Sequence, residues 1–315
     1  MSAIERKPNW TQWPRVMAVR RRSATIDLLV RAMDGYSWHR TGRNAALVAH
    51  YGFLSIFPLV AVFTTILGFV LQDRPDLQAD IINSSLGRIP IIGPQIVADP
   101  TQLRGSFLVL VLGLLTSLWA GMRAFVGLQG SLDDILEIPL DHRSNGAIVR
   151  VHALVAIGGV GGSQIGTAVL SSIAGITNIA ILGRISLMLI SVSVNVFVLG
   201  VCYRWLCSRR QSWRNVLPGA VGAGIGFSAL QFVGTAVVGR AMANASAIYG
   251  TFSVVIGLIT WLSLLATMAL LGAEANAALE GRRREQASLA ATDGDRKSTR
   301  LNSSHRNTSR MPSSA

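Results

Sequence analysis

The chain has 315 residues, of which 50% are apolar and only 14% are charged, and its mean hydropathy is +0.44. An average soluble domain carries about 25% charged residues, so this composition excludes an ordinary water-soluble protein. Two cysteines, Cys202 and Cys207, are too few for a disulfide framework, and we expect both to be free thiols at a helix end.

Residues 1–44 form a basic arm with nine lysines and arginines and three acidic residues. Between residues 26 and 34, apolar side chains alternate with Asp27, Arg31 and Asp34. This pattern is typical of a short helix that lies on a membrane surface. A solvated basic arm is the alternative. Because 44 polar and basic residues precede the first apolar run, we expect no cleaved signal peptide.

Six apolar stretches follow, and they contain only two of the chain's formal charges, Arg123 and Arg184. A helix of about 20 residues crosses a hydrocarbon core of about 30 Å. The sequence therefore predicts an all-α, polytopic membrane protein, a bundle of six transmembrane helices over residues 45–272. The predicted spans are 45–71, 106–127, 151–174, 179–201, 217–238 and 249–271.

Arginines are concentrated in alternate connections, and this predicts the orientation. The arm, residues 202–216 and residues 282–284 are arginine-rich, whereas residues 72–105 carry more acidic than basic side chains. Because basic loops stay in the cytoplasm, both termini are expected to be cytoplasmic. The connection 128–150 fits this rule least well. The net charge of +13 then indicates contact with anionic phospholipids on the cytoplasmic face rather than with nucleic acid.

The chain ends in two segments of different composition. Residues 273–294 are predicted to be a cytoplasmic C-terminal tail. Residues 295–315 turn abruptly to Ser, Thr and Asn and contain Lys297, one of two lysines in a chain with 27 arginines. This segment resembles a translated sequencing adaptor, so we expect it not to belong to the native protein. Without its five basic residues and one acidic residue, the net charge falls to +9.

Helix-breaking and small residues give the spans an internal pattern. Pro58 lies in the middle of the first span and predicts a tilted or broken helix, because proline removes a backbone hydrogen bond. Glycine runs at 158–166 and 219–226 contain the Gly-x-x-x-Gly pairs Gly162/Gly166 and Gly222/Gly226. Such pairs let membrane helices approach closely, so we expect these runs to pack against neighbouring helices.

Ionisable groups in membrane spans are costly and are functional candidates by default. His50, beside Tyr51 and one turn before Ser55, is either a proton-sensitive or ligand-binding group or a hydrogen-bonded interior histidine. Arg123 either snorkels to the headgroups or pairs with Glu274 or with the acids at 133 and 134.

Neutral amides and clustered carboxylates complete the candidates. Gln164, Asn195 and Gln231 either form interhelical hydrogen bonds or line a polar cavity. The carboxylates at 133, 134 and 137 share one helix face and either bind a divalent cation or form a solvated helix end. The sequence contains no motif typical of a metal centre, a cofactor site or a catalytic nucleophile, so we expect no metal, no cofactor and no enzymatic activity.

Four ordered motifs carry a family resemblance: HYGFLSIFPLVAVF (50–63), RNVLPGAVGA (214–223), YGTFSVVIGLITW (249–261) and LLGAEANAAL (270–279). They resemble the YihY/BrkB family of bacterial inner-membrane proteins over about residues 40–285. The residues that match the family pattern are Tyr51, Ser55, Pro58, Pro218, Gly219, Tyr249, Gly250, Trp261, Gly272, Glu274 and Asn276.

This resemblance implies a multi-pass protein of the bacterial cytoplasmic (inner) membrane and a role in moving lipid-linked or envelope components. A transporter would build its polar cavity from His50, Gln164, Asn195 and Gln231 beside the kinked first helix. In a non-transporting scaffold, the same groups would only tie helices together. The family has also carried a ribonuclease name, but RNA hydrolysis needs metal ligands or an acid–base pair, which the spans do not offer.

Overall fold

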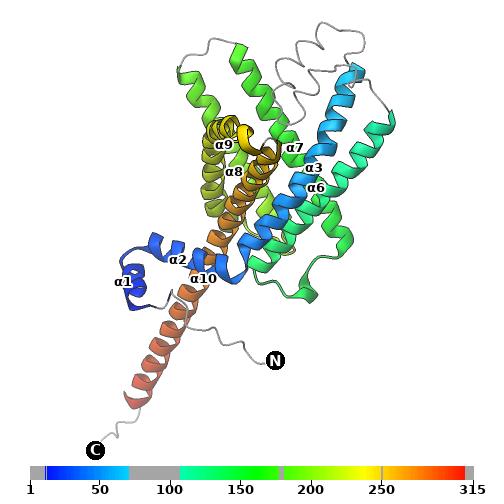
Figure 1. Ribbon diagram of the computed structural model, residues 1–315. Helices are drawn as coiled ribbons and strands as arrows, with labels where there is room; N and C mark the ends of the chain where they lie inside the picture. Colours follow the sequence, from blue (N-terminus) through cyan, green and yellow to red (C-terminus); the bar gives the residue numbers. More distant parts are fainter. Residues whose placement is uncertain (1–10, 12, 71–106, 177–180, 250, 309–315) are drawn as a thin grey trace, which may run out of the picture.

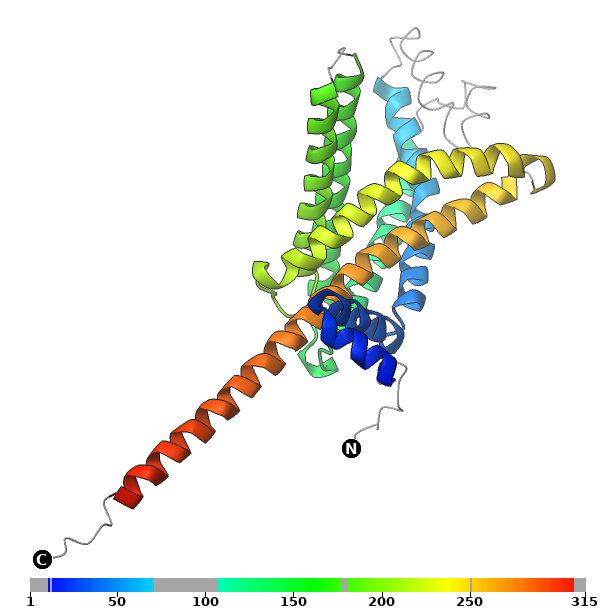
Figure 2. The ribbon, with the colours of Figure 1, turned by 90° about the vertical axis from the view of Figure 1, so that its left-hand side faces the viewer.

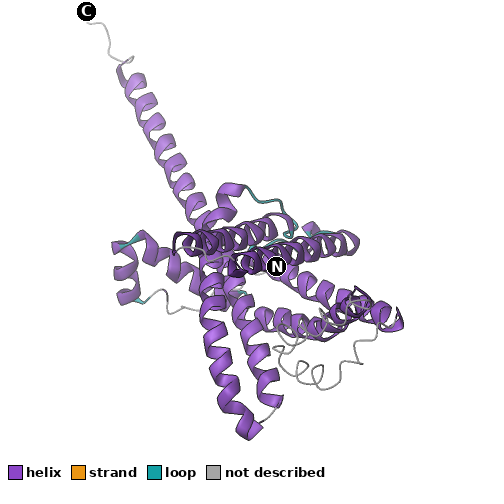
Figure 3. Cartoon of the chain, turned by 90° about the horizontal axis from the view of Figure 1, so that it is seen from above, coloured by secondary structure: helices purple, strands orange, loops and turns teal. Residues whose placement is uncertain are grey.

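The protein is mostly helical in the part that the computed structural model describes, which is residues 11, 13–70, 107–176, 181–249 and 251–308 (Figures 1 and 3). Six long helices make up the body of this described part. They are α3 (Thr41–Val70), α6 (Phe107–Ile135), α7 (Gly146–Ile176), α8 (Ile181–Trp205), α9 (Trp213–Tyr249) and α10 (Thr251–Thr308). Each contains one of the six predicted apolar stretches, apart from a few terminal residues.

Four stretches of these helices, within the described residues, are long and apolar enough to cross a membrane. They are Leu110–Ile135, Gly146–Ser163, Met188–Trp205 and Val255–Thr292. The prediction of an all-helical membrane protein is confirmed. The connection 72–105 lies outside the described residues.

Helices α9 and α10 run side by side and are strongly inclined to the pair α7 and α8 (Figure 2). Helix α3 packs along α6 on one side and touches α10 on the other. Helix α10 is 58 residues long and continues far past the predicted end of the sixth span at residue 271. The predicted tail 273–294 is therefore part of the same helix.

Helix α3 passes through Pro58 as one continuous helix, so the expectation of a break is wrong, while the expected tilt or kink stays a prediction. Helix α6 supports this region closely, because a Cβ atom on Gly113 would lie 3.3 Å from the carbonyl oxygen of Pro58. One turn earlier, the Ser55 hydroxyl donates to the carbonyl of Gly52 at 2.7 Å. The packing of α6 along α3 holds the helix together where proline removes a donor.

The basic arm folds into two helices, α1 (Pro14–Arg22) and α2 (Ala24–Trp38), so the predicted short helix is present in this part. Asp27 joins them: it accepts from Arg20 at 2.7 Å and from Arg31 at 3.0 Å. Arg31 also reaches Glu285 of α10 at 3.0 Å. We call this region, where α1 and α2 meet the start of α3 and residues 273–285 of α10, the basic end of the bundle.

The buried apolar core lies near the basic end, where α3, α6, α8, α9 and α10 converge. It contains large side chains such as Leu206 and Leu270 and a row of alanines that allows the helices to pack closely. The core residues are Ala45, Leu132, Ile135, Tyr203, Leu206, Val216, Ala220, Ala266, Leu270 and Ala273.

The glycines of the two runs differ in how closely neighbouring atoms pack against them. Gly226 packs against Met268, where an added Cβ would lie 2.7 Å from the sulfur, so close packing holds at this position. A Cβ on Gly162 or Gly222 would meet no described atom within 4 Å, so no described neighbour supports the expected packing role at these two positions. Gly166 has no described side-chain surroundings.

Candidate functional site at the basic end of the bundle

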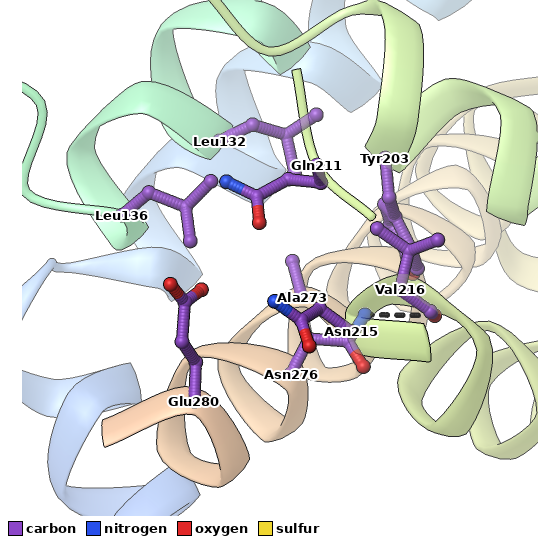
Figure 4. A pocket seen from close by; sticks show the side chains of 9 residues that line it. All are labelled: Leu132, Leu136, Tyr203, Gln211, Asn215, Val216, Ala273, Asn276 and Glu280. Atoms are coloured by element: carbon purple, nitrogen blue, oxygen red, sulfur yellow. Dashed lines mark hydrogen bonds between the residues drawn. The ribbon is translucent and has the colours of Figure 1, made fainter. Parts of the chain in front are cut away.

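Asn276 on α10 clamps the first turns of α9. Its Oδ1 accepts the backbone N–H of Gly219 at 2.7 Å, and its Nδ2 donates to the carbonyl of Val216 at 3.0 Å (Figure 4). Pro218 has no N–H, and its ring crowds the preceding turn of α9. The amide of Asn276 thus satisfies one donor and one acceptor in the turn that proline disturbs, and it ties α9 to α10.

Two glycines let α9 and α10 cross at this clamp almost backbone to backbone. A Cβ on Gly272 would lie 2.6 Å from the Cβ of Ala223 and 2.7 Å from the carbonyl oxygen of Gly219. A Cβ on Gly219 would overlap the carbonyl oxygen of Gly272. The hydroxyl of Tyr203 on α8 donates to the carbonyl of Ala269 in the same place. The crossing has no room for a side chain at either glycine.

A small void of about 20 Å³ adjoins the crossing and lies among residues of α6, α9 and α10 and of the α8–α9 connection (Figure 4). Gln211 and Asn276 contribute amides to its lining, and Glu280 contributes a carboxylate. This volume fits about one water molecule and no larger ligand.

Glu274, two residues before Asn276 on α10, is buried with 2% of its surface exposed. Its Oε1 accepts the hydroxyl of Thr41 at 2.6 Å and faces Nδ1 of His39 at 3.0 Å. Gly35 of α2 packs directly against the carboxylate, where a side chain would collide with it. We call Glu274, Thr41 and His39 the Glu274 site. A buried carboxylate is stable only with such partners, because its desolvation is costly.

The backbone turn between α2 and α3 places both partners of Glu274. Arg40 adopts a left-handed conformation with φ of 54°, which reverses the chain between His39 and Thr41. This conformation is unfavourable for a residue other than glycine. It brings the last residue after α2 and the first residue of α3 onto the same carboxylate.

His39 is electrostatically coupled to several acids. Burial disfavours its charged form, but the hydrogen bond and charge of Glu274, together with the charges of Glu137 and Asp134, outweigh burial and raise the pKa of His39 above its ordinary value. Its Nε2 lies 3.8 Å from Oε1 of Glu137. Relative to a free imidazole, the charged form of His39 is therefore stabilised beside the buried carboxylate.

A charged cavity of about 460 Å³ opens beside the Glu274 site. His39, Gly35 and Glu274 form part of its wall. The other charged side chains that line it are Arg20, Arg31, Asp34, Glu137, Arg209, Glu280 and Arg284. Both signs of charge face this volume, so the cavity can hold a charged polar group, with arginines as donors to phosphate or carboxylate oxygens.

Sequence comparison gives this site a family context. The profile of the virulence factor BrkB family matches residues 32–297, a range that includes the whole Glu274 site and the Asn276 clamp. The chain belongs to the virulence factor BrkB family. It is 25% identical over 262 residues to an uncharacterized protein of Dickeya dadantii (strain 3937), and the alignment covers 76% of this chain and 79% of that protein. No solved structure matches the chain.

The structure brings together five of the BrkB-family motif residues identified in the sequence. Pro218, Gly219, Gly272, Glu274 and Asn276 all lie at the basic end, either in the clamp and glycine crossing or directly beside them. The other motif residues are dispersed. Tyr51 and Ser55 are half-buried on α3, and Trp261 is half-buried on α10. Tyr249 ends α9 with a side chain outside the described part, and Gly250 lies outside the described residues.

Two charged candidates point away from the site. His50 is exposed and meets Tyr51 edge-on, with ring centroids 5.6 Å apart, so the interior alternative for His50 is wrong. Arg123 is exposed and lies 5.5 Å from the centroid of the Trp119 ring. The suggested pair between Arg123 and Glu274 is wrong, because Glu274 binds Thr41 and His39 instead.

The amide candidates form an interhelical contact. Nδ2 of Asn195 on α8 donates to the Ser228 hydroxyl at 3.0 Å and to Oε1 of Gln231 at 3.3 Å, both on α9. The side chain of Gln164 lies outside the described part. Among the described cavities, none is lined by His50, Asn195 or Gln231.

The three carboxylates at the end of α6 bind different partners, so the divalent-cation alternative fails. Asp133 accepts the N–H of Ser208 at 2.9 Å and its hydroxyl at 2.7 Å, and it is 3% exposed. A solvated helix end is therefore also wrong for Asp133. Asp134 pairs with Arg143 at 2.8 Å, while Glu137 turns toward His39.

Sequence reasoning missed His39 and Thr41, because the arm was interpreted only through its charge and its apolar periodicity. Gly35 was missed as well. One signal was available: a histidine close to the start of the first long helix can titrate near neutral pH. Nothing in the local pattern indicates that this histidine faces Glu274, which lies 235 residues later in the chain.

Proposed function

We propose that this BrkB-family membrane protein is a transporter or translocator of lipid-linked or envelope components in a bacterial inner membrane, and that it catalyses no covalent reaction. The observation that carries this proposal is the charged cavity of about 460 Å³ beside the buried Glu274 site. Its arginines suit the phosphate or carboxylate groups that lipid-linked and envelope components carry. The wall also contains the titratable imidazole of His39 and the buried carboxylate of Glu274. In this proposal, the charge on this pair changes as the substrate binds or leaves.

The proposal includes a membrane orientation with six spans, α3 and α6 to α10, and the basic end in the cytoplasm. The positive-inside rule supports this, because the arginines of α1, α2 and residues 282–284 lie at this end. Helix α2 exposes Leu29 by 60% and Met33 by 47% of their surfaces. Such a face supports contact with anionic phospholipids at the interface rather than with nucleic acid.

A non-transporting scaffold is the second candidate, and one contact favours it. Asn195 of α8 donates to both Ser228 and Gln231 of α9. Polar groups that satisfy each other in this way tie helices together and leave no free group to line a path.

Reconstitution into proteoliposomes separates the two candidates. The vesicles would contain fluorescent phosphatidylglycerol or phosphatidylethanolamine, or enclose an anionic fluorescent solute. We expect the wild type to accelerate movement of at least one probe over protein-free vesicles, Glu274→Gln to lose most of that acceleration, and His50→Ala to retain it. The unfolding free energy of each variant in detergent would be measured in parallel. Wild-type protein that moves none of the probes would support the scaffold.

A further inference from the structure

An apolar groove of about 420 Å³ lies between α7 and α8, away from the charged cavity. Residues 151–160 of α7 form one wall and residues 197–206 at the end of α8 form the other. Val155 and Phe197 are exposed by 57% and 63% in its walls. Gly159 leaves the floor open, because a Cβ there would meet no described atom within 4 Å.

The position of the groove suits a lipid chain. Its walls belong to two of the stretches that can cross a membrane, Gly146–Ser163 and Met188–Trp205. Ten helical residues extend over about 14 Å, which is close to half of a hydrocarbon core of about 30 Å. The groove therefore has the length of one leaflet, and its exposed apolar walls face the acyl chains of that leaflet.

Basic groups lie at one end of the groove, near the start of α7 and the end of α8. The guanidinium of Arg210 is 5.9 Å from the ring centroid of Trp205, which lines the groove. Arg150 is exposed and directly precedes the first lining residue of α7. Neither arginine forms an ion pair with another described residue. Nδ1 of His152, in the wall, is buried and has no hydrogen-bond partner among the described residues.

We propose that this groove binds one acyl chain of an anionic phospholipid whose phosphate lies beside Arg210 and Arg150. The apolar walls select a chain. The two guanidinium groups, neither in an ion pair with a described residue, select a negative headgroup, and His152 offers a polar contact where chain and headgroup join. The site is independent of the charged cavity and of transport. A structural lipid bound here would fill the gap between two helices that otherwise contact each other sparsely.

Native mass spectrometry of the full chain, released from mild detergent micelles with added phosphatidylglycerol or phosphatidylcholine, tests the site. We expect the wild type to retain one phosphatidylglycerol in preference to phosphatidylcholine. Gly159→Leu should fill the groove and abolish this retention. Gly158→Leu is the matched control, since Gly158 also has open space around it but does not line the groove. Both changes favour the helix, so neither is expected to unfold α7.

The headgroup is tested separately. Arg210→Gln should reduce the preference for phosphatidylglycerol about fivefold, the change expected from one basic residue beside an anionic headgroup. Arg123→Gln, which removes an arginine stacked on Trp119 of α6, should leave the preference unchanged. Equal lipid retention by the wild type and Gly159→Leu would overturn the proposal. So would a wild type that retains no lipid but forms a dimer which Gly159→Leu dissociates, because a second copy would then occupy the groove.

Discussion

Replacing Glu274 with alanine should destabilise the protein far more than replacing any exposed acid of the same helix. Glu274→Ala leaves the Thr41 hydroxyl and the His39 imidazole without their acceptor in a site where the carboxylate is only 2% exposed. Removing one partner of a buried ion pair costs about 3–5 kcal/mol. The measurement is the free energy of unfolding in detergent, followed by tryptophan fluorescence during titration with SDS.

Glu285→Ala is the matched control on α10. The Glu285 side chain is 56% exposed, and its partner Arg31 keeps a second carboxylate at Asp27. An exposed pair of this kind contributes about 0–1 kcal/mol. The double variant His39→Ala/Glu274→Ala should cost less than the sum of its two single variants, because the two residues share one interaction. Equal losses in Glu274→Ala and Glu285→Ala would refute the reasoning.

Four further outcomes follow from the same contacts. Folding raises the pKa of His39, so the stabilisation by the charged imidazole should be complete below about pH 6.5 and decline as pH rises through the pKa of the folded state. His39→Gln should remove this pH-dependent part of the free energy of unfolding. Gly219→Ala should destabilise by about 1–3 kcal/mol through overlap at the crossing, whereas Gly222→Ala, in open space on the same helix, should be neutral or stabilising in the same SDS titration. Burial raises the pKa of the Cys207 thiol to about 12, so maleimide should label it at about pH 8 only after unfolding, and rapid labelling of the folded protein would contradict the structure. Gln129 is 1% exposed, and neither of its side-chain amide atoms has a hydrogen-bond partner among the described residues. Gln129→Met should therefore raise the free energy of unfolding by about 1 kcal/mol, and a loss of stability would contradict this reasoning.

Much of the fold could be predicted because bilayer-length apolar runs are a direct consequence of hydrocarbon thickness. The same argument could not set the ends of the helices. Helix α10 contains no proline and continues to Thr308, although its last residues are rich in Ser, Thr and Asn, which have low helix propensity, so local propensity could not have set its end. Pro58 illustrates the opposite error, because neighbouring α6 supports a helix that local chemistry alone would interrupt.

The candidate site was predictable only in pieces. Glu274 and Asn276 were identified through the family motif, and the structure gives each a physical role, one as a buried charge and the other as a clamp. Arg123 was a reasonable partner for Glu274 by charge and by membrane depth. The Glu274 carboxylate instead makes short, buried contacts with Thr41 and His39. Charge alone cannot predict which of several partners at the same membrane depth a carboxylate will contact.

The sequence by itself determined that this chain is an all-helical membrane protein of the BrkB family type, because hydropathy and charge act locally along the chain and can be counted without coordinates. Only the tertiary structure decided where the polar groups meet. It placed the basic arm against α10, turned Arg40 so that His39 faces Glu274, and separated the carboxylates at the end of α6. The reason is that a buried polar group is satisfied by whichever partner the packing of distant helices brings within about 3 Å, and that distance is set by the whole bundle.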